Sequence, residues 1–184
     1  LVDATSAVNL AKDWQNFTSE IDFTDVSYNA GKVEVNQFIF DGNDLGRTSE
    51  AFVNRSMNIE TVEVKVNISH AYRGDLNIFL ESPNGVVSEL VRQSNDNNDN
   101  YDNWVFSSVA HWDENSFGLW KLKVNDTEAG TAGTWNDWNI TFYGYPEKDS
   151  DSDGLPDYAE FIIGTGFNNP DWDNDGLLDG EEYY

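Results

Sequence analysis

The chain has 184 residues, of which 39% are hydrophobic and 14% aromatic, enough for one ordinary domain with a real core and a small appendage. Its formal net charge of −24 repels phosphates and therefore argues against nucleic acid and anionic membranes as partners. It has no cysteine, so disulfides do not stabilise it, and no apolar run approaches the ~18 residues of a membrane span.

Residues 1–20 have the spacing of a short amphipathic helix, and Asp3 is a suitable N-cap. The apolar stripe comprises Ala4, Ala7, Val8, Ala11 and Trp14. A helix this short needs a partner surface to be stable. The chain begins without an initiator Met or a signal-peptide pattern, so we expect it to be a piece of a longer protein.

The longest alternating pattern runs from Asn58 to Leu80 and predicts two strands. Apolar residues occupy every second position, first at Val62, Val64, Val66 and Ile68, and then at Leu76, Ile78 and Leu80. Such alternation is typical of a strand with one buried face. Because a break containing Gly74 separates the two runs, we expect residues 58–69 and 76–81 to be antiparallel neighbours in one sheet.

Shorter alternating segments predict the rest of an all-β fold. We expect strands at residues 32–40, 86–91, 104–112, 119–124 and 138–144, with a weaker indication at 21–23. Turn-forming segments separate them, including tight loops at 41–46 and 82–85 and a polar loop at 93–103. About eight short strands indicate a β-sandwich of undefined strand order. The chain then divides into a helical segment (1–20), a sandwich (21–146) and an acidic module (147–184).

The strongest local signal is a 22-residue repeat in the acidic module. Each copy follows the pattern Asp-x-Asp-x-Asp-Gly-x-x-Asp-x-x-Glu. A 12-residue calcium loop supplies oxygens from positions 1, 3, 5, 7, 9 and 12, and a glycine at position 6 makes its sharp turn. The expected Ca²⁺ ligands are therefore Asp149, Asp151, Asp153, the Leu155 carbonyl, Asp157 and Glu160 in the first copy, and Asp171, Asp173, Asp175, the Leu177 carbonyl, Asp179 and Glu182 in the second.

The alternative interpretation, a solvated acidic tail, does not explain why the glycine and the terminal Glu recur in both copies. Five carboxylates in one short loop also repel one another strongly unless a cation is bound. Only residues 156–163 have helical character, so the flanks do not suit the paired long helices of an EF-hand. The tail instead resembles the thrombospondin type 3-like repeats of bacterial secreted proteins. This resemblance implies tandem loops that calcium stiffens.

Several spaced motifs in the middle of the chain resemble the P domain, or Homo B domain, of kexin- and furin-type subtilisin-like proteases. The motifs are residues 70–76 (His-Ala-Tyr-Arg-Gly-Asp-Leu), 82–85 (Ser-Pro-Asn-Gly), 106–112, 118–122 (Gly-Leu-Trp-Lys-Leu) and 133–138 (Gly-Thr-Trp-Asn-Asp-Trp). The resemblance covers roughly residues 25–145. One departure is Asp113-Glu114, where the family commonly has Gly-Glu after the His-Trp pair.

The resemblance implies a jelly-roll sandwich that packs on a protease catalytic domain and supports its folding. It implies a secreted serine endopeptidase as the parent protein, with residues 1–20 containing the last helix of its catalytic domain. The family's catalytic Asp, His and Ser would precede Leu1, so we expect no catalysis from this chain and structural roles for His70 and His111. Protein substrate is a further possible partner.

Other residues offer weaker candidate sites. Loop carboxylates that could bind an additional Ca²⁺ are Asp41, Asp44, Asp75, Asp96, Asp99 and Asp102. Five tryptophans could form a sugar-stacking platform, although residues at strand spacing are more often core. They are Trp104, Trp112, Trp120, Trp135 and Trp138. The alternative function is therefore a substrate- or carbohydrate-binding β-sandwich module.

Overall fold

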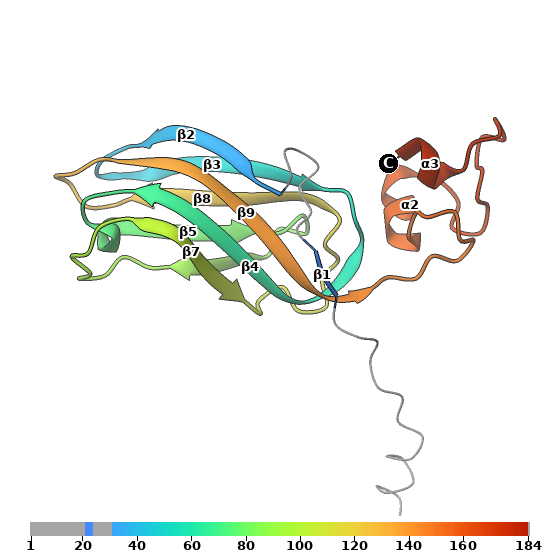
Figure 1. Ribbon diagram of the computed structural model, residues 1–184, viewed down its shortest axis with the longest axis horizontal. Helices are drawn as coiled ribbons and strands as arrows, with labels where there is room; N and C mark the ends of the chain where they lie inside the picture. Colours follow the sequence, from blue (N-terminus) through green and yellow to red (C-terminus); the bar gives the residue numbers. More distant parts are fainter. Residues whose placement is uncertain (1–20, 24–30, 184) are drawn as a thin grey trace, which may run out of the picture.

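The computed structural model describes residues 21–23 and 31–183. Two antiparallel sheets face each other, and a small helical unit lies at one end of them (Figure 1). The prediction of an all-β sandwich is confirmed. The helix expected within residues 1–20 lies outside the described residues. None of the described helices combines the length and the apolar character needed to cross a membrane.

The first sheet has five strands. They are β1 (Ile21–Phe23), β2 (Val33–Ile39), β4 (Met57–Ser69), β7 (Tyr101–Ser108) and β9 (Gly133–Pro146). The strand order is β1-β9-β4-β7, and β2 also pairs with β9. Because β4 pairs with β9 along most of its length, β1 and β2 share the opposite edge of β9. This long strand therefore ties the first sheet together.

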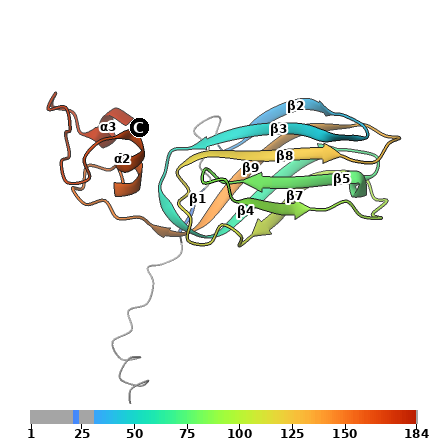
Figure 2. The same cartoon turned by 180° about the vertical axis from the view of Figure 1, so that it is seen from behind.

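The second sheet has four strands and lies nearer the viewer in Figure 2. They are β3 (Asn43–Val53), β5 (Leu76–Glu81), β6 (Val87–Val91) and β8 (Gly118–Asp126), in the order β3-β8-β5-β6. Alternate residues of β4, β5 and β8 are buried. The inner faces of the two sheets thus form one core, which includes Val62, Val64, Leu76, Ile78, Trp120, Trp138 and Phe142.

The strands β4 and β5 lie in opposite sheets, so the prediction that they are neighbours in one sheet was wrong. Residues 70–75 carry the chain from one layer to the other, and Arg73–Asp75 form a short 3₁₀ turn (η1) that leads into β5. Each strand instead pairs with β9 or β8, which come much later in the sequence. Alternation shows which side chains face the core, but both layers face the same core.

The strand β3 begins at Asn43, inside the segment that was expected to be a tight loop. Most of its side chains are partly or fully exposed, so its sequence carries no alternating apolar pattern before Ala51 and Val53. Gly46 has a φ of +62°, and a Cβ at this position would lie 2.4 Å from the Val124 carbonyl oxygen. Glycine therefore allows β3 to approach β8 at an irregularity in their register.

The acidic module contains two short helices, α2 (Asp157–Ile163) and α3 (Asp179–Tyr183). The predicted helix ends as expected, because Gly164 adopts the left-handed conformation with φ 90°. Leu155 and Ala159 are completely buried in one hydrophobic cluster with Phe117 of the sandwich, and Phe52 packs against that cluster. The first repeat is thus attached to the end of the sandwich where β3 ends and β8 begins.

Candidate metal centre

The first acidic repeat folds into a tight loop around the carboxylate of Asp149. One oxygen of Asp149 accepts a hydrogen bond from the Ser152 amide at 2.7 Å, and the other accepts one from the Gly154 amide at 3.1 Å. Gly154 has a φ of +97°, as the sequence predicted for position 6. These turns bring Asp149, Asp151 and Asp153 together, with ligand oxygens within 4.8 Å of one another.

A second group of carboxylates lies deeper in the module and joins the two repeats. Asp153, Glu160 and Asp179 have ligand oxygens within 4.8 Å of one another, and all three residues are buried. Both oxygens of Glu160, both of Asp151 and Oδ2 of Asp179 are buried without a hydrogen-bond partner. Burial, followed by the charges of Asp151 and Asp153, raises the pKa of Glu160 to about 7.

This donor set fits a calcium ion. Calcium is a hard cation that takes six to eight oxygens from carboxylates and carbonyls. A buried polar atom without a partner costs free energy, and neighbouring carboxylates repel one another. An ion bound among Asp149, Asp151, Asp153 and Glu160 would remove both costs. The unpartnered oxygens, rather than the number of acids, distinguish this group from a solvated acidic surface.

The second repeat forms a similar but more exposed loop. Asp171 accepts hydrogen bonds from the amides of Asp175 and Gly176, and Gly176 has a φ of +101°. The ligand oxygens of Asp171, Asp173 and Asp175 lie within 4.8 Å of one another, but Asp173 and Asp175 are exposed. Glu182 at position 12 is also exposed, and partial loss of hydration, followed by the Asp173 charge, raises its pKa.

Position 9 behaves differently in the two repeats. In the first, Asp157 Oδ1 accepts the Ser150 amide and Oδ2 accepts the Ser150 hydroxyl, both at 2.7 Å. Both oxygens of Asp157 are therefore already engaged within the loop. In the second, Asp179 Oδ1 accepts the Trp172 amide at 2.9 Å, and its Oδ2 has no partner. The repeat pattern alone could not show this difference.

Of the loop carboxylates outside the tail, only Asp75 joins a group of possible metal ligands within the described residues, together with His70 and Asp126. His70 Nε2 lies 3.1 Å from Asp126 Oδ2, and both side chains are fully buried. The other oxygen of Asp126 accepts the Glu128 amide at 3.2 Å. These bonds link the segment after β4 to the end of β8, so we interpret this group as a structural clamp.

The remaining loop carboxylates belong to no such group of possible ligands within the described residues. Asp41 Oδ1 accepts the Gly130 amide at 2.8 Å, and Asp102 Oδ1 accepts the Asn103 side-chain amide at 3.2 Å. Asp44, expected in a loop, is an exposed residue of β3. Asp96 binds Arg73 Nε at 2.7 Å, and Asp99 accepts Asn100 Nδ2 at 3.2 Å.

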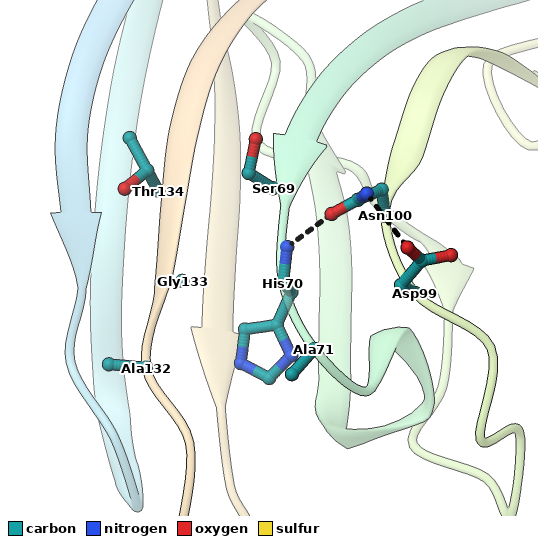
Figure 3. Close-up of a pocket in the computed structure, with 8 residues that line it drawn as sticks. All are labelled: Ser69, His70, Ala71, Asp99, Asn100, Ala132, Gly133 and Thr134. Carbon is teal, nitrogen blue, oxygen red and sulfur yellow. Dashed lines mark hydrogen bonds between the residues drawn. The ribbon is translucent and has the colours of Figure 1, made fainter.

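A shallow hollow of about 360 Å³ opens where β4 ends and β9 begins (Figure 3). The backbone amide of His70 donates to Asn100 Oδ1 at 2.9 Å, which ties β4 to the loop before β7. A Cβ on Gly133 would lie 2.4 Å from His70 Cδ2, so glycine is needed for this close packing. The imidazole has no exposed surface, so the hollow offers no reactive histidine.

A second buried histidine, His111, forms a hydrogen-bond relay with Ser88 and Glu114. The three residues resemble the nucleophile, base and acid of a catalytic triad. His111 Nε2 lies 3.0 Å from Ser88 Oγ, and His111 Nδ1 lies 2.8 Å from Glu114 Oε2. His111 has no exposed surface and packs edge-on against Trp120, with ring centres 5.0 Å apart. A substrate therefore has no access to the histidine. We interpret the relay as a hydrogen-bond network that joins β6 to the segment between β7 and β8.

The five candidate tryptophans do not form one platform. Trp120, Trp135 and Trp138 are completely buried in the core. Trp104 and Trp112 were expected to enter the core, but they are 43% and 64% exposed. The guanidinium of Arg73 lies 4.8 Å from the centre of the Trp104 ring, so that ring already stacks on a cation. The structure therefore offers little support for a sugar-binding face.

The matching family model and the sequence relatives point to the same group of proteins, the kexin-like proprotein convertases. Residues 59–142 match the family described as the proprotein convertase P-domain. The chain is 34% identical over 168 residues to the dibasic-processing endoprotease of Schizosaccharomyces pombe, an alignment that covers 84% of this chain and 23% of that protein. It is 30% identical over 154 residues to kexin of Saccharomyces cerevisiae, covering 78% of this chain and 18% of kexin. The chain thus spans less than a quarter of these relatives.

Among solved structures, the chain is similar to a serine protease of Aeromonas sobria, with a TM-score of 0.63 and 19% sequence identity. The similar region covers 78% of this chain and 30% of that protease chain. At this level of identity the likeness concerns the fold alone. It agrees with the two-sheet arrangement of the described residues.

Proposed function

We propose that this chain is a non-catalytic C-terminal segment of a secreted subtilisin-like serine endopeptidase, because residues 59–142 match the proprotein convertase P-domain family. The observation that carries the proposal is the family match, which runs from β4 to β9 and thus includes strands of both layers. The role that we propose is to dock on the catalytic domain and stabilise it.

An exposed apolar patch supports a docking role. Phe38 is 66% exposed, Phe40 46% and Leu45 81%, all near the corner between β2 and β3. Large apolar side chains that gather on a surface commonly mark a contact site. Arg47 lies over the Phe40 ring at 4.1 Å and places a cation beside these apolar side chains. We propose that the catalytic domain of the same polypeptide covers the patch.

The second part of the proposal is that the acidic repeats bind calcium as thrombospondin type 3-like loops. The support is the set of buried, unpartnered oxygens on Asp151, Glu160 and Asp179. Calcium would fix the loops and the hydrophobic cluster that attaches the first repeat to the sandwich. Calcium concentrations outside cells suit such sites, because extracellular modules bind with dissociation constants of about 10⁻⁴–10⁻³ M.

The test of the docking role uses the complete gene that encodes this chain. We would express it with and without residues 21–146 and measure the yield of active endopeptidase in the culture medium. The proposal predicts a large loss of active enzyme without the sandwich. A variant that carries polar residues at Phe38 and Leu45 should show a smaller loss of the same kind. Full yield without residues 21–146 would refute the stabilising role.

A further inference from the structure

We propose that Asp179, in the second acidic repeat, is a ligand of the calcium ion held by the first repeat. The first site is then complete only when the second repeat is folded against it. This inference rests on the proposed calcium binding of the repeats. The two loops then form one module with coupled calcium sites and do not bind calcium independently.

The first argument is the position of the free oxygen. Asp179 Oδ2 is buried without a hydrogen-bond partner, and Asp179 itself is only 4% exposed. It belongs to the same group as Asp153 and Glu160, whose ligand oxygens lie within 4.8 Å. Both Glu160 oxygens are buried and unpartnered as well. A cation in the first site would satisfy atoms from both repeats.

The second argument is the contrast at position 2 of the repeats. Ser150 presents both an amide and a hydroxyl to Asp157, so both oxygens of that carboxylate are used inside the first loop. Trp172 occupies the equivalent position of the second loop and presents its amide alone to Asp179. One substitution in the repeat therefore leaves Asp179 Oδ2 available to the neighbouring site.

The third argument is the close contact that holds the repeats in register. The amide of Gly180 donates to Asp153 Oδ2 at 3.2 Å. A Cβ at Gly180 would lie 2.4 Å from the Asp153 carbonyl oxygen, so the backbones touch where α3 begins. The residue next to Asp179 is thus fixed to a ligand of the first site. Filling either site should favour the other, because a coupling between two sites is reciprocal.

The experiment is a calcium titration of the metal-free 184-residue chain, followed by amide NMR. The Leu155 amide donates to Asp153 and reports on the first site, while the Leu177 amide donates to Asp175 and reports on the second. We expect Asp179→Asn to raise the calcium midpoint seen at Leu155 by at least about tenfold, because one charged ligand is lost. Glu181→Gln removes the same charge two residues away and should leave that midpoint nearly unchanged.

A second variant tests whether the effect of Asp179→Asn comes from unfolding of the module and not from the loss of a calcium ligand. Trp172→Ser removes no carboxylate but offers Asp179 Oδ2 a hydroxyl partner, as Ser150 does in the first repeat. It should also raise the Leu155 midpoint. An unchanged Leu155 midpoint in both variants would overturn the inference while leaving calcium binding intact. If neither amide of the unsubstituted chain responds to calcium, the proposed calcium function fails, and this inference fails with it.

Discussion

Leu155 of the first acidic repeat is completely buried in the same hydrophobic cluster as Phe117 of the sandwich. Leu177 occupies the equivalent position of the second repeat and is 51% exposed. Of these two leucines, Leu155 is therefore the one that attaches the module to the sandwich, and Tyr183 of α3 adds a second contact, with its ring centre 5.9 Å from that of Phe117. The backbone carbonyl of Leu155 is an expected calcium ligand, so one residue serves both the attachment and the proposed metal site.

Replacing Leu155 by Ala should detach the module from the sandwich. A Leu→Ala change in a core costs roughly 2–5 kcal/mol. Because the cluster is small and separate from the main core, we expect local opening of residues 147–183 with the sandwich intact. Limited proteolysis and hydrogen exchange would detect this opening. Leu177→Ala is the matched control and should leave the protection of both regions unchanged.

Removing calcium should lower the melting temperature of the module. If calcium is present at a hundredfold above a loop's dissociation constant, binding adds about 2.7 kcal/mol of stability. We expect excess EGTA to abolish this contribution in a calorimetric scan and calcium to restore it. Magnesium should restore little, because it requires a smaller octahedral site and retains its water. An identical scan with and without EGTA would contradict the calcium assignment.

Ser88→Ala should destabilise the sandwich, because we interpret Ser88 as a structural hydrogen-bond partner of His111 and not as a nucleophile. The change leaves Nε2 of the buried His111 without a partner, at a cost of about 1–3 kcal/mol. Urea denaturation would measure the loss, and Ser107→Ala on the exposed face of β7 is the control. Labelling of Ser88 by a fluorophosphonate probe would instead show a reactive serine and disprove the structural role.

Asp126→Asn should change how stability depends on pH. Burial raises the pKa of Asp126 above its ordinary value of 3.8, and the hydrogen bond from His70 offsets part of the rise. The stability contributed by this raised pKa is present below pH 3.8 and is lost as the pH rises through the folded-state pKa.

We therefore expect the unsubstituted protein to lose stability relative to Asp126→Asn as the pH rises through that window. Urea denaturation of both proteins across the window would measure the difference. Parallel stability curves would show that Asp126 does not titrate in this range.

The fold class followed from the sequence because alternating apolar residues report burial directly. Strand pairing did not follow, because β4 pairs with β9 and β5 pairs with β8 across large separations in the chain. The sequence did not predict the strand β3, for a different reason. Its pairing partner β8 supplies the apolar pattern, while most of its own side chains face water.

The repeat pattern brought its predicted ligands together locally, but it did not define how the two repeats contact each other. Asp149, Asp151 and Asp153 lie in one group because short turns fold them around a glycine. The position of Asp179 beside Glu160 depends on tertiary packing of α3 on the first loop. The only local signal was the change from Ser150 to Trp172, and its meaning requires the hydrogen bonds.

The pairing of β1 with the end of β9 has a mechanical consequence. Ile21 lies opposite Gly144 and Phe23 opposite Phe142, so the chain enters and leaves the sandwich at the same end. Hydrogen bonds in an antiparallel ladder run perpendicular to the strands. Tension applied before Ile21 and after Pro146 would break the hydrogen bonds between β1 and β9 one pair at a time. Once β1 had peeled away, the β2–β9 ladder would carry the load next, because β2 follows β1 in the chain and pairs with the same edge of β9.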